Sequence, residues 1–146
     1  MNDDEFLPGL GTRDVPYLDL LGVKPVRRDN GDYEFRMKVE HQHLRPYGII
    51  HGGAIASLLD TALGMSVGIA ADVGMHMVTV QLNINYIRPT WEGEEIIAHG
   101  ELQHKGGKTA VARGEVRTVD GTLIATASGT FMYLPMPKGA VMEKKD

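Results

Sequence analysis

Residues 45–64 read Arg45-Pro46-Tyr47-Gly48-Ile49-Ile50-His51-Gly52-Gly53-Ala54-Ile55-Ala56-Ser57-Leu58-Leu59-Asp60-Thr61-Ala62-Leu63-Gly64, and the fold is decided by this stretch. It opens with turn residues bounded by glycine and continues into a long apolar segment that predicts a helix. From residue 54 to residue 71 the only ionisable side chain is that of Asp60. A carboxylate alone in such a segment indicates a functional role.

The predicted helix has two unlike faces when its side chains are placed at about 100° per residue. One stripe is strongly apolar and should face a sheet; it consists of Ile55, Leu58, Leu59, Ala62, Met65 and Ile69. Asp60 lies nearly opposite, among small or apolar neighbours: Ala56, Ser57, Gly64 and Val67. A solvent-facing side would carry Lys, Glu or Gln, and a monomer with one helix has nothing left to cover this face, so we predict a homodimer.

The residues before this helix predict short elements. Residues 16–22 form a helical turn that stops at Gly22, and residues 23–28 form a strand. The turn signal at residues 29–31 leads to a second strand, in which Tyr33, Phe35, Met37 and Val39 alternate with charged residues.

The residues after the helix predict four long strands and no further helix. In the first of these strands the apolar residues alternate with polar ones and should face the helix; they are Val78, Val80, Leu82, Ile84 and Tyr86. The other three strands cover residues 95–104, 109–119 and 122–134, with a hairpin turn at Asp120-Gly121. The fold class is therefore α+β, an antiparallel sheet wrapped around one long central helix. We expect residues 1–146 to form a single domain, with loose tails at residues 1–14 and 136–146.

Composition excludes several classes of function. The net charge is −4 with scattered Lys and Arg, so there is no basic stripe for nucleic acid. The chain has no cysteine, which excludes disulfides and thiolate chemistry. Its acidic start is unlike a signal peptide, so we expect a cytoplasmic protein. Asp60 at the centre of the apolar segment would cost about 3 kcal/mol in lipid, which argues against a membrane span.

The start of the helix is a candidate site for a carbonyl or an anion. The first amides, those of Gly52 and Gly53, have no intrahelical acceptor and lie at the positive end of the helix dipole, where they can hold an oxyanion. Asp60 is eight residues further on, about 12 Å along the axis. One helix cannot bring both groups to the same atom, but two antiparallel helices across a dyad can.

His51-Gly52-Gly53 with Asp60 nine positions after the histidine resembles the hotdog-fold acyl-CoA thioesterases of the phenylacetate-pathway and thioesterase-superfamily-member type. The resemblance covers about residues 15–135 and includes the strand at residues 78–86. It implies that Asp60 is the nucleophile or general base and that the Gly52 amide polarises the thioester carbonyl. It further implies that the Thr79 hydroxyl helps to position water. The family forms dimers, often paired into tetramers, and needs no cofactor because CoA is part of the substrate.

Several basic residues are weaker candidates for binding the substrate. Such enzymes often have Asn or Gln six residues before the histidine, where this chain has Arg45, which could bind a carboxylate or a CoA phosphate, or no ligand. Arg88, Lys105 and Lys108 lie at strand ends, where they could meet CoA phosphates.

The histidines favour structural roles. We expect His51, although it belongs to the motif, to orient the loop by a hydrogen bond rather than to act as the base. His41 and His43 would share one face of a strand, but without a third ligand they predict no metal site. Two alternatives to a thioesterase remain open: a non-catalytic acyl-CoA binding protein and a hotdog hydratase or dehydratase.

Overall fold

A computed structural model describes residues 15–138 of the chain as one long helix packed against one six-stranded sheet. The helices and 3₁₀ turns are α1 (Pro16–Leu21), η1 (His41–His43), η2 (Pro46–Gly48) and α2 (Gly52–Ile69). The strands are β1 (Lys24–Arg27), β2 (Tyr33–Lys38), β3 (Met75–Tyr86), β4 (Glu95–Lys105), β5 (Thr109–Thr118) and β6 (Leu123–Pro135). The predicted elements are confirmed except for the strand at His41 and His43, and the helical stop at Gly22 has the left-handed φ of 72°.

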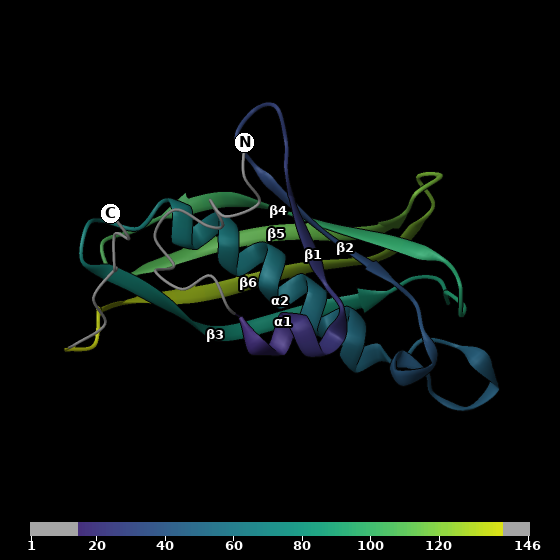
Figure 1. The fold of residues 1–146 in the computed structure, drawn as a ribbon. Coiled ribbons are helices and arrows are strands. Elements are labelled where there is room, and N and C mark those ends of the chain that lie inside the picture. Colours follow the sequence, from purple (N-terminus) through teal and green to yellow (C-terminus); the bar gives the residue numbers. More distant parts are fainter. Residues whose placement is uncertain (1–14, 139–146) are drawn as a thin grey trace.

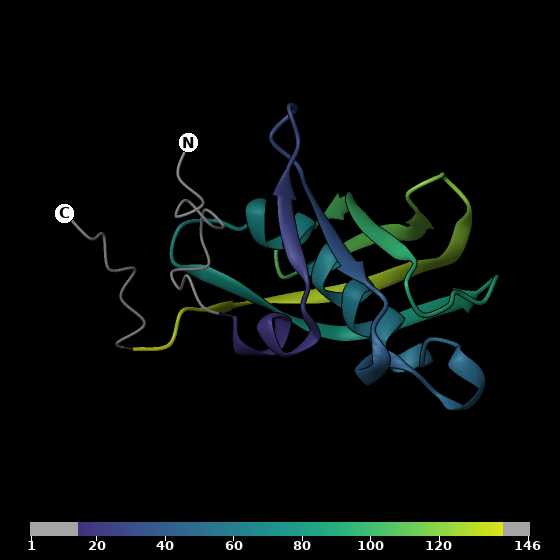
Figure 2. The ribbon, with the colours of Figure 1, turned by 45° about the vertical axis from the view of Figure 1, so that its right-hand side comes forward.

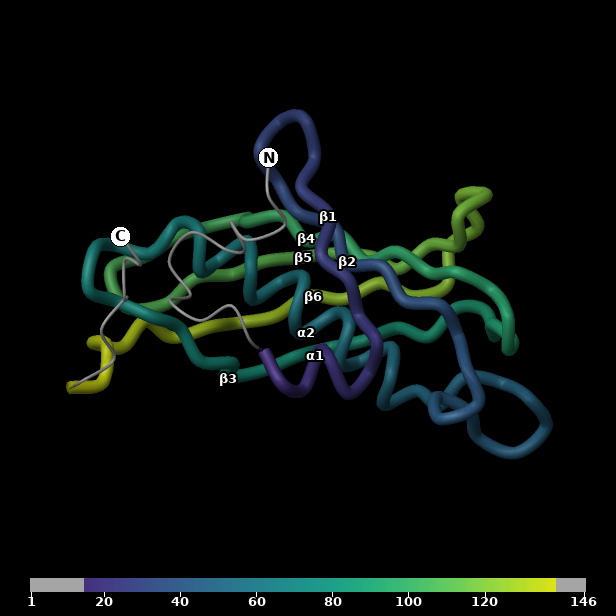
Figure 3. Tube along the Cα trace, viewed as in Figure 1, coloured from purple at the N-terminus to yellow at the C-terminus, as the bar shows by residue number. Residues whose placement is uncertain are grey.

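The sheet curves around α2 (Figures 1 and 2). Its strand order is β1-β2-β4-β5-β6-β3, and each pair of neighbours is antiparallel. The strand that follows α2 in the chain therefore forms one edge of the sheet, while the strands that precede α2 form the other edge. The tube in Figure 3 shows the loop before α2 at the end of the molecule opposite the start of β3.

Glycines in the sheet let α2 approach closely. Gly100 of β4 and Gly114 of β5 are cross-strand partners. A Cβ atom on Gly100 would lie 2.4 Å from the carbonyl oxygen of Ala62, and one on Gly114 would lie 2.6 Å from a methyl group of Leu63. The backbone of α2 thus rests almost directly on the sheet, and this contact fixes the height at which the helix presents its side chains.

The alternation predicted for residues 78–86 is wrong in its first half. The register of β3 against β6 shifts between Thr79 and Gln81, which indicates a β-bulge. Because the bulge adds one residue, Thr79 faces the helix and Val78 points away from it, paired with the exposed Met132. Beyond the bulge, Leu82 and Ile84 pack against the core as predicted.

The prediction that its own chain leaves the Asp60 face of α2 uncovered is also wrong in part. Gly64 and Val67 are buried within the protomer, because a Cβ on Gly64 would lie 2.7 Å from the Met77 side chain and the Tyr133 hydroxyl donates to the Val67 carbonyl over 2.9 Å. Ile69, expected in the sheet-facing stripe, is 47% exposed. The sheet wraps further around the helix than a flat layer would, so β3 and β6 contact residues that a helical wheel places opposite the core.

The structure also bears on the predictions for the apolar segment and for the ends of the chain. By length and composition α2 could span a membrane, but half of it is buried against the sheet, as in the core helix of a globular domain. At the start of the predicted tail, residues 136–146, the Met136 amide donates to the Gly74 carbonyl. The predicted arm at residues 1–14 and the end of the tail, residues 139–146, lie outside the described residues.

Candidate active site

His43 anchors the loop that leads into α2. It is 3% exposed, its Nδ1 accepts from the Glu40 amide at 3.0 Å, and its Nε2 lies 2.7 Å from the Leu21 carbonyl. Nε2 therefore carries the proton and donates it to that carbonyl. The His43 carbonyl in turn accepts from the His51 amide at 2.7 Å. The strand predicted for His41 and His43 is wrong, since both lie in the 3₁₀ turn η1, where the ring of His43 has a structural role.

His51 caps the start of α2. Its Nδ1 accepts from the Gly53 amide at 2.8 Å, and its carbonyl accepts from the Ala54 amide at 3.0 Å. The Gly53 amide, expected to help bind the substrate, is therefore already engaged. The Gly52 amide has no acceptor among the described residues, so it is the free donor at this positive helix end.

Tyr86 covers Gly52, and the sequence pattern identified it only as a strand residue, not as part of the site. Its hydroxyl donates to the Gly52 carbonyl at 2.9 Å, and a Cβ on Gly52 would lie 3.3 Å from the tyrosine ring. Its place at the end of β3, the strand paired with α2 in the prediction, was the available signal. Tyr86 holds the first turn of α2 against the sheet edge.

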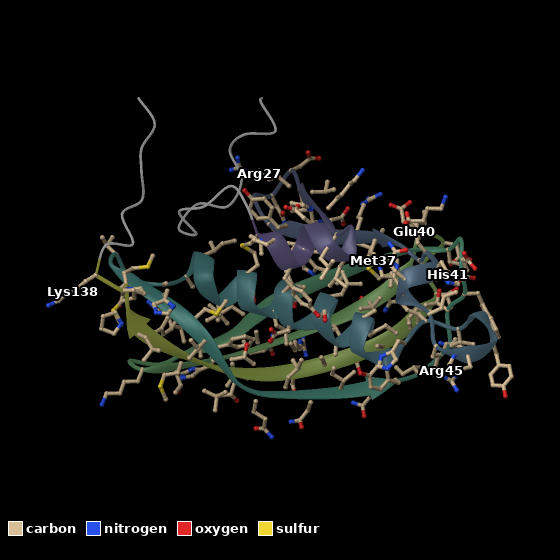
Figure 4. All side chains as sticks on the ribbon, turned by 60° about the horizontal axis from the view of Figure 1, so that its bottom comes forward. Arg27, Met37, Glu40, His41, Arg45 and Lys138 are labelled. Atoms are coloured by element: carbon tan, nitrogen blue, oxygen red, sulfur yellow. The ribbon has the colours of Figure 1, made fainter. Side chains whose placement is uncertain are left out.

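A cavity of about 340 Å³ opens beside the free amide. Its lining residues are Arg45, Ile49, Ile50, Gly52, Ile55, Tyr86, Ile87, Arg88 and Pro89. Two of the predicted substrate-binding residues, Arg45 and Arg88, thus share one cavity with Gly52. Figure 4 shows Arg45 at the opposite end of the molecule from Lys138.

Lys105 and Lys108 do not join this cavity. Lys105 ends β4 and donates to Asp72 at 2.8 Å, a hydrogen bond that raises the pKa of its ammonium group. Lys108 lies on the same β4–β5 hairpin. Because Asp72 follows the carboxyl end of α2, this hairpin lies at the far end of the helix from Gly52, and neither lysine lines the Gly52 cavity of the same chain.

Asp60 and Thr79 meet on the open side of α2, beside the edge strand. The Thr79 hydroxyl donates to the Asp60 carboxylate at 2.7 Å, and Asp60 is half-buried. Within residues 15–138, no Lys, Arg or His approaches the Asp60 carboxylate to within 4 Å. One carboxylate oxygen is therefore oriented by Thr79, and the other remains available for chemistry.

The arrangement therefore consists of a free amide with a cavity at one point of α2 and an oriented, unpaired carboxylate two turns further along. A family model described as "Thioesterase superfamily" matches residues 47–125, a range that includes both points. The chain belongs to the thioesterase superfamily.

Solved structures and a curated relative agree with this membership. The BH2602 protein from Bacillus halodurans, solved with CoA, is 30% identical and superposes with a TM-score of 0.79 over 85% of this chain and 82% of that one. The PaaI protein of the Escherichia coli phenylacetic acid degradation operon is 25% identical, with a TM-score of 0.75 over 84% of this chain and 86% of PaaI. The medium/long-chain acyl-CoA thioesterase YigI of Escherichia coli is 36% identical over 98 residues, which are 58% of this chain and 62% of YigI.

The thioesterase described here has the hotdog fold expected from the resemblance, with the sheet wrapped around α2. Membership supports thioester hydrolysis as its class of reaction. The matched segment holds the whole of α2 and β3, the elements that carry Gly52, Asp60 and Thr79.

Proposed function

We propose that this thioesterase hydrolyses an acyl-CoA to the free acid and CoA in a site shared by two subunits. The observation that carries the proposal is the Asp60 carboxylate, oriented by Thr79 and without a cationic partner in the described part of the chain. A carboxylate kept for stability would normally be paired when it lies among apolar residues. The substrate class is supported by the names of the relatives, one an acyl-CoA thioesterase and one solved with CoA.

In the proposed site the thioester carbonyl accepts a hydrogen bond from the Gly52 amide. This bond strengthens as negative charge develops on the oxygen, so it stabilises the transition state more than the ground state. Two reactions by the acid fit this arrangement. Asp60 can attack the carbonyl carbon, expelling the CoA thiolate and leaving a mixed anhydride that water then cleaves. Alternatively, Asp60 can remove a proton from a water that attacks the carbonyl.

The proposed homodimer follows from the distance along α2. Gly52 and Asp60 are about 12 Å apart along the axis, too far to act on one carbonyl. In an antiparallel pair of helices, Gly52 of one subunit faces Asp60 of the partner subunit. Two features support such a pair: β3 is at the edge of the sheet, and its exposed apolar side chains include Val80 at 56% and Tyr86 at 54%. A further pairing into tetramers is the arrangement expected from the resemblance.

The first test is release of free thiol from a panel of acyl-CoAs by the wild-type protein and by Asp60→Asn. We expect Asp60→Asn to lose most turnover while it still binds acyl-CoA. Asp72→Asn is the matched control, because it removes the same charge at a position beyond the carboxyl end of α2 and should leave turnover intact. Turnover near the wild-type value in Asp60→Asn, with the dimer intact, would contradict the assigned role. A binding protein would show thermal stabilisation without thiol release, and a hydratase would alter the acyl chain without freeing CoA.

The second test addresses the shared site. Mixing Asp60→Asn chains with Gly52→Pro chains should restore part of the activity, because one of the two sites in a heterodimer then has both intact groups. Verified heterodimers without restored activity would place Gly52 and Asp60 in separate functions.

A further inference from the structure

Two arginines line the cavity beside Gly52, and the cavity has no acidic lining residue. Arg45 comes from the loop before α2, and Arg88 follows β3. The Nη1 of Arg88 donates to the Leu123 carbonyl at 3.0 Å, which fixes one side of its guanidinium and leaves the other donors free. Arg45 is exposed, with no carboxylate within 4 Å in the described part of the chain.

Two arginines elsewhere in the sheet, unlike those of the cavity, are paired with carboxylates. Arg36 pairs with Glu34 and Arg117 with Glu115, both at 2.6 Å. On this chain the cavity instead adds the positive end of α2 to the two guanidinium groups, so three positive features converge with no negative one among the lining residues of the same chain. Such a cavity favours an anion in its occupant. In the proposed dimer, Asp60 of the partner subunit joins the cavity at its Gly52 end, where it acts on the thioester carbonyl.

We propose that Arg45 and Arg88 bind the distal carboxylate of the acyl group, so that the preferred substrates are CoA thioesters of short dicarboxylic acids. This inference rests on the proposed function. A guanidinium binds a carboxylate through two parallel hydrogen bonds and carries a positive charge. Asn or Gln at the position of Arg45 would be neutral and could not form this charged pair. The apolar side chains of Ile49, Ile55 and Ile87 would line the methylene groups between the two ends of the acyl chain.

The size of the cavity favours the acyl carboxylate over the CoA diphosphate as the bound anion. The cavity is open to solvent on one side, and a compact space of its 340 Å³ is about 9 Å across. In a glutaryl group the carboxylate lies about 5 Å from the thioester carbon, because four bonds separate them. The diphosphate is separated from the sulfur by an extended arm of about 15 Å, so it would leave a cavity whose wall includes Gly52.

The test compares glutaryl-CoA with pentanoyl-CoA, which have acyl chains of equal length. We expect the wild type to have the higher kcat/KM for glutaryl-CoA. In Arg45→Gln and Arg88→Gln the ratio of the two kcat/KM values should fall by about 10- to 100-fold, the effect of a lost charged hydrogen bond. In Arg45→Lys this ratio should fall by an intermediate factor, because lysine keeps the charge but cannot form the two parallel hydrogen bonds of a guanidinium. Arg27→Gln, an exposed arginine of β1, is the control and should leave the ratio unchanged.

Three outcomes would overturn the inference. One is an unchanged ratio in both variants. The second is an equal loss with both CoA esters that disappears with the corresponding pantetheine esters, which would assign the arginines to the diphosphate. The third is a wild type that prefers pentanoyl-CoA. Calorimetric binding of both esters in the Asp60→Asn background measures the same preference without turnover. An arginine-dependent preference in binding, with no thiol release by the wild type, would therefore reject the proposed function and keep only the binding of the distal carboxylate by Arg45 and Arg88.

Discussion

Replacing Gly52 by proline removes one N–H group from the start of α2 while keeping the path of the backbone. Gly52 is the first residue of the helix, a position that proline adopts readily. His51 before it has φ −70° and ψ 134°, an extended conformation that proline allows in its predecessor. The lost N–H has no acceptor among the described residues, so its removal leaves the hydrogen bonds of the loop intact.

The matched variant is Gly52→Ala. Either substitution adds a Cβ atom 3.3 Å from the Tyr86 ring, so the ring must shift by a few tenths of an ångström in both. Only the proline variant lacks the proposed oxyanion donor. Removal of one such donor typically lowers kcat by about 10²- to 10³-fold, or about 3–4 kcal/mol in the barrier. We therefore expect Gly52→Pro to turn over at least about 100-fold more slowly than Gly52→Ala.

The assay is continuous detection of free thiol at saturating acyl-CoA, with the melting temperature and the oligomeric state of each variant measured beside it. The comparison is valid where the two variants are folded alike. A kcat ratio below about 10 between them, under the range for a lost oxyanion donor, would refute the assignment of Gly52. A loss confined to KM would assign the amide to binding of the ground state.

Three further predictions concern the scaffold around the site. His51→Ala should lower the free energy of unfolding by about 1 kcal/mol because the Gly53 amide loses its cap, and His51→Asn should recover most of it in thermal or urea unfolding; equal stability of all three proteins would deny His51 the capping role. Gly100→Ala should destabilise the fold by roughly 1–3 kcal/mol or more, since its Cβ meets the Ala62 carbonyl, whereas Gly107→Ala has open space and should melt like the wild type. The hydrogen bond from Arg117 lowers the pKa of Glu115 from its ordinary value of 4.5, so this carboxylate stabilises the fold above that value and loses the effect as the pH falls through its lowered pKa. Glu115→Gln should therefore be less stable than the wild type at pH 7, with the difference shrinking in unfolding experiments toward pH 3; a constant difference would contradict this linkage.

Local patterns in the sequence predict the helices and strands and identify the residues to test. Alternation in residues 33–39, the turn signals at Gly22 and Asp120-Gly121, and the apolar run after Gly52 are local patterns, and local patterns follow from side-chain period and backbone preference. Asp60 stood out for the same kind of reason, because a lone carboxylate in an apolar run is visible without coordinates. The family resemblance added Thr79, whose hydroxyl the structure brings to Asp60.

The packing of segments that are distant in the chain sets which side chains face the helix and which groups form hydrogen bonds. The bulge after Thr79 turned that residue toward the helix, and the curl of the sheet buried Gly64 and Val67, both of which depend on pairing with distant strands. It also separated the two lysines from the cavity and placed Arg88 with Arg45, which are 43 positions apart in the chain. In the folded chain the Gly53 amide donates to His51, and the Gly52 amide has no acceptor among the described residues. Such outcomes depend on which groups meet across the fold, and neither the period of a strand nor the angle of a helical wheel contains that information, because both describe a segment in isolation.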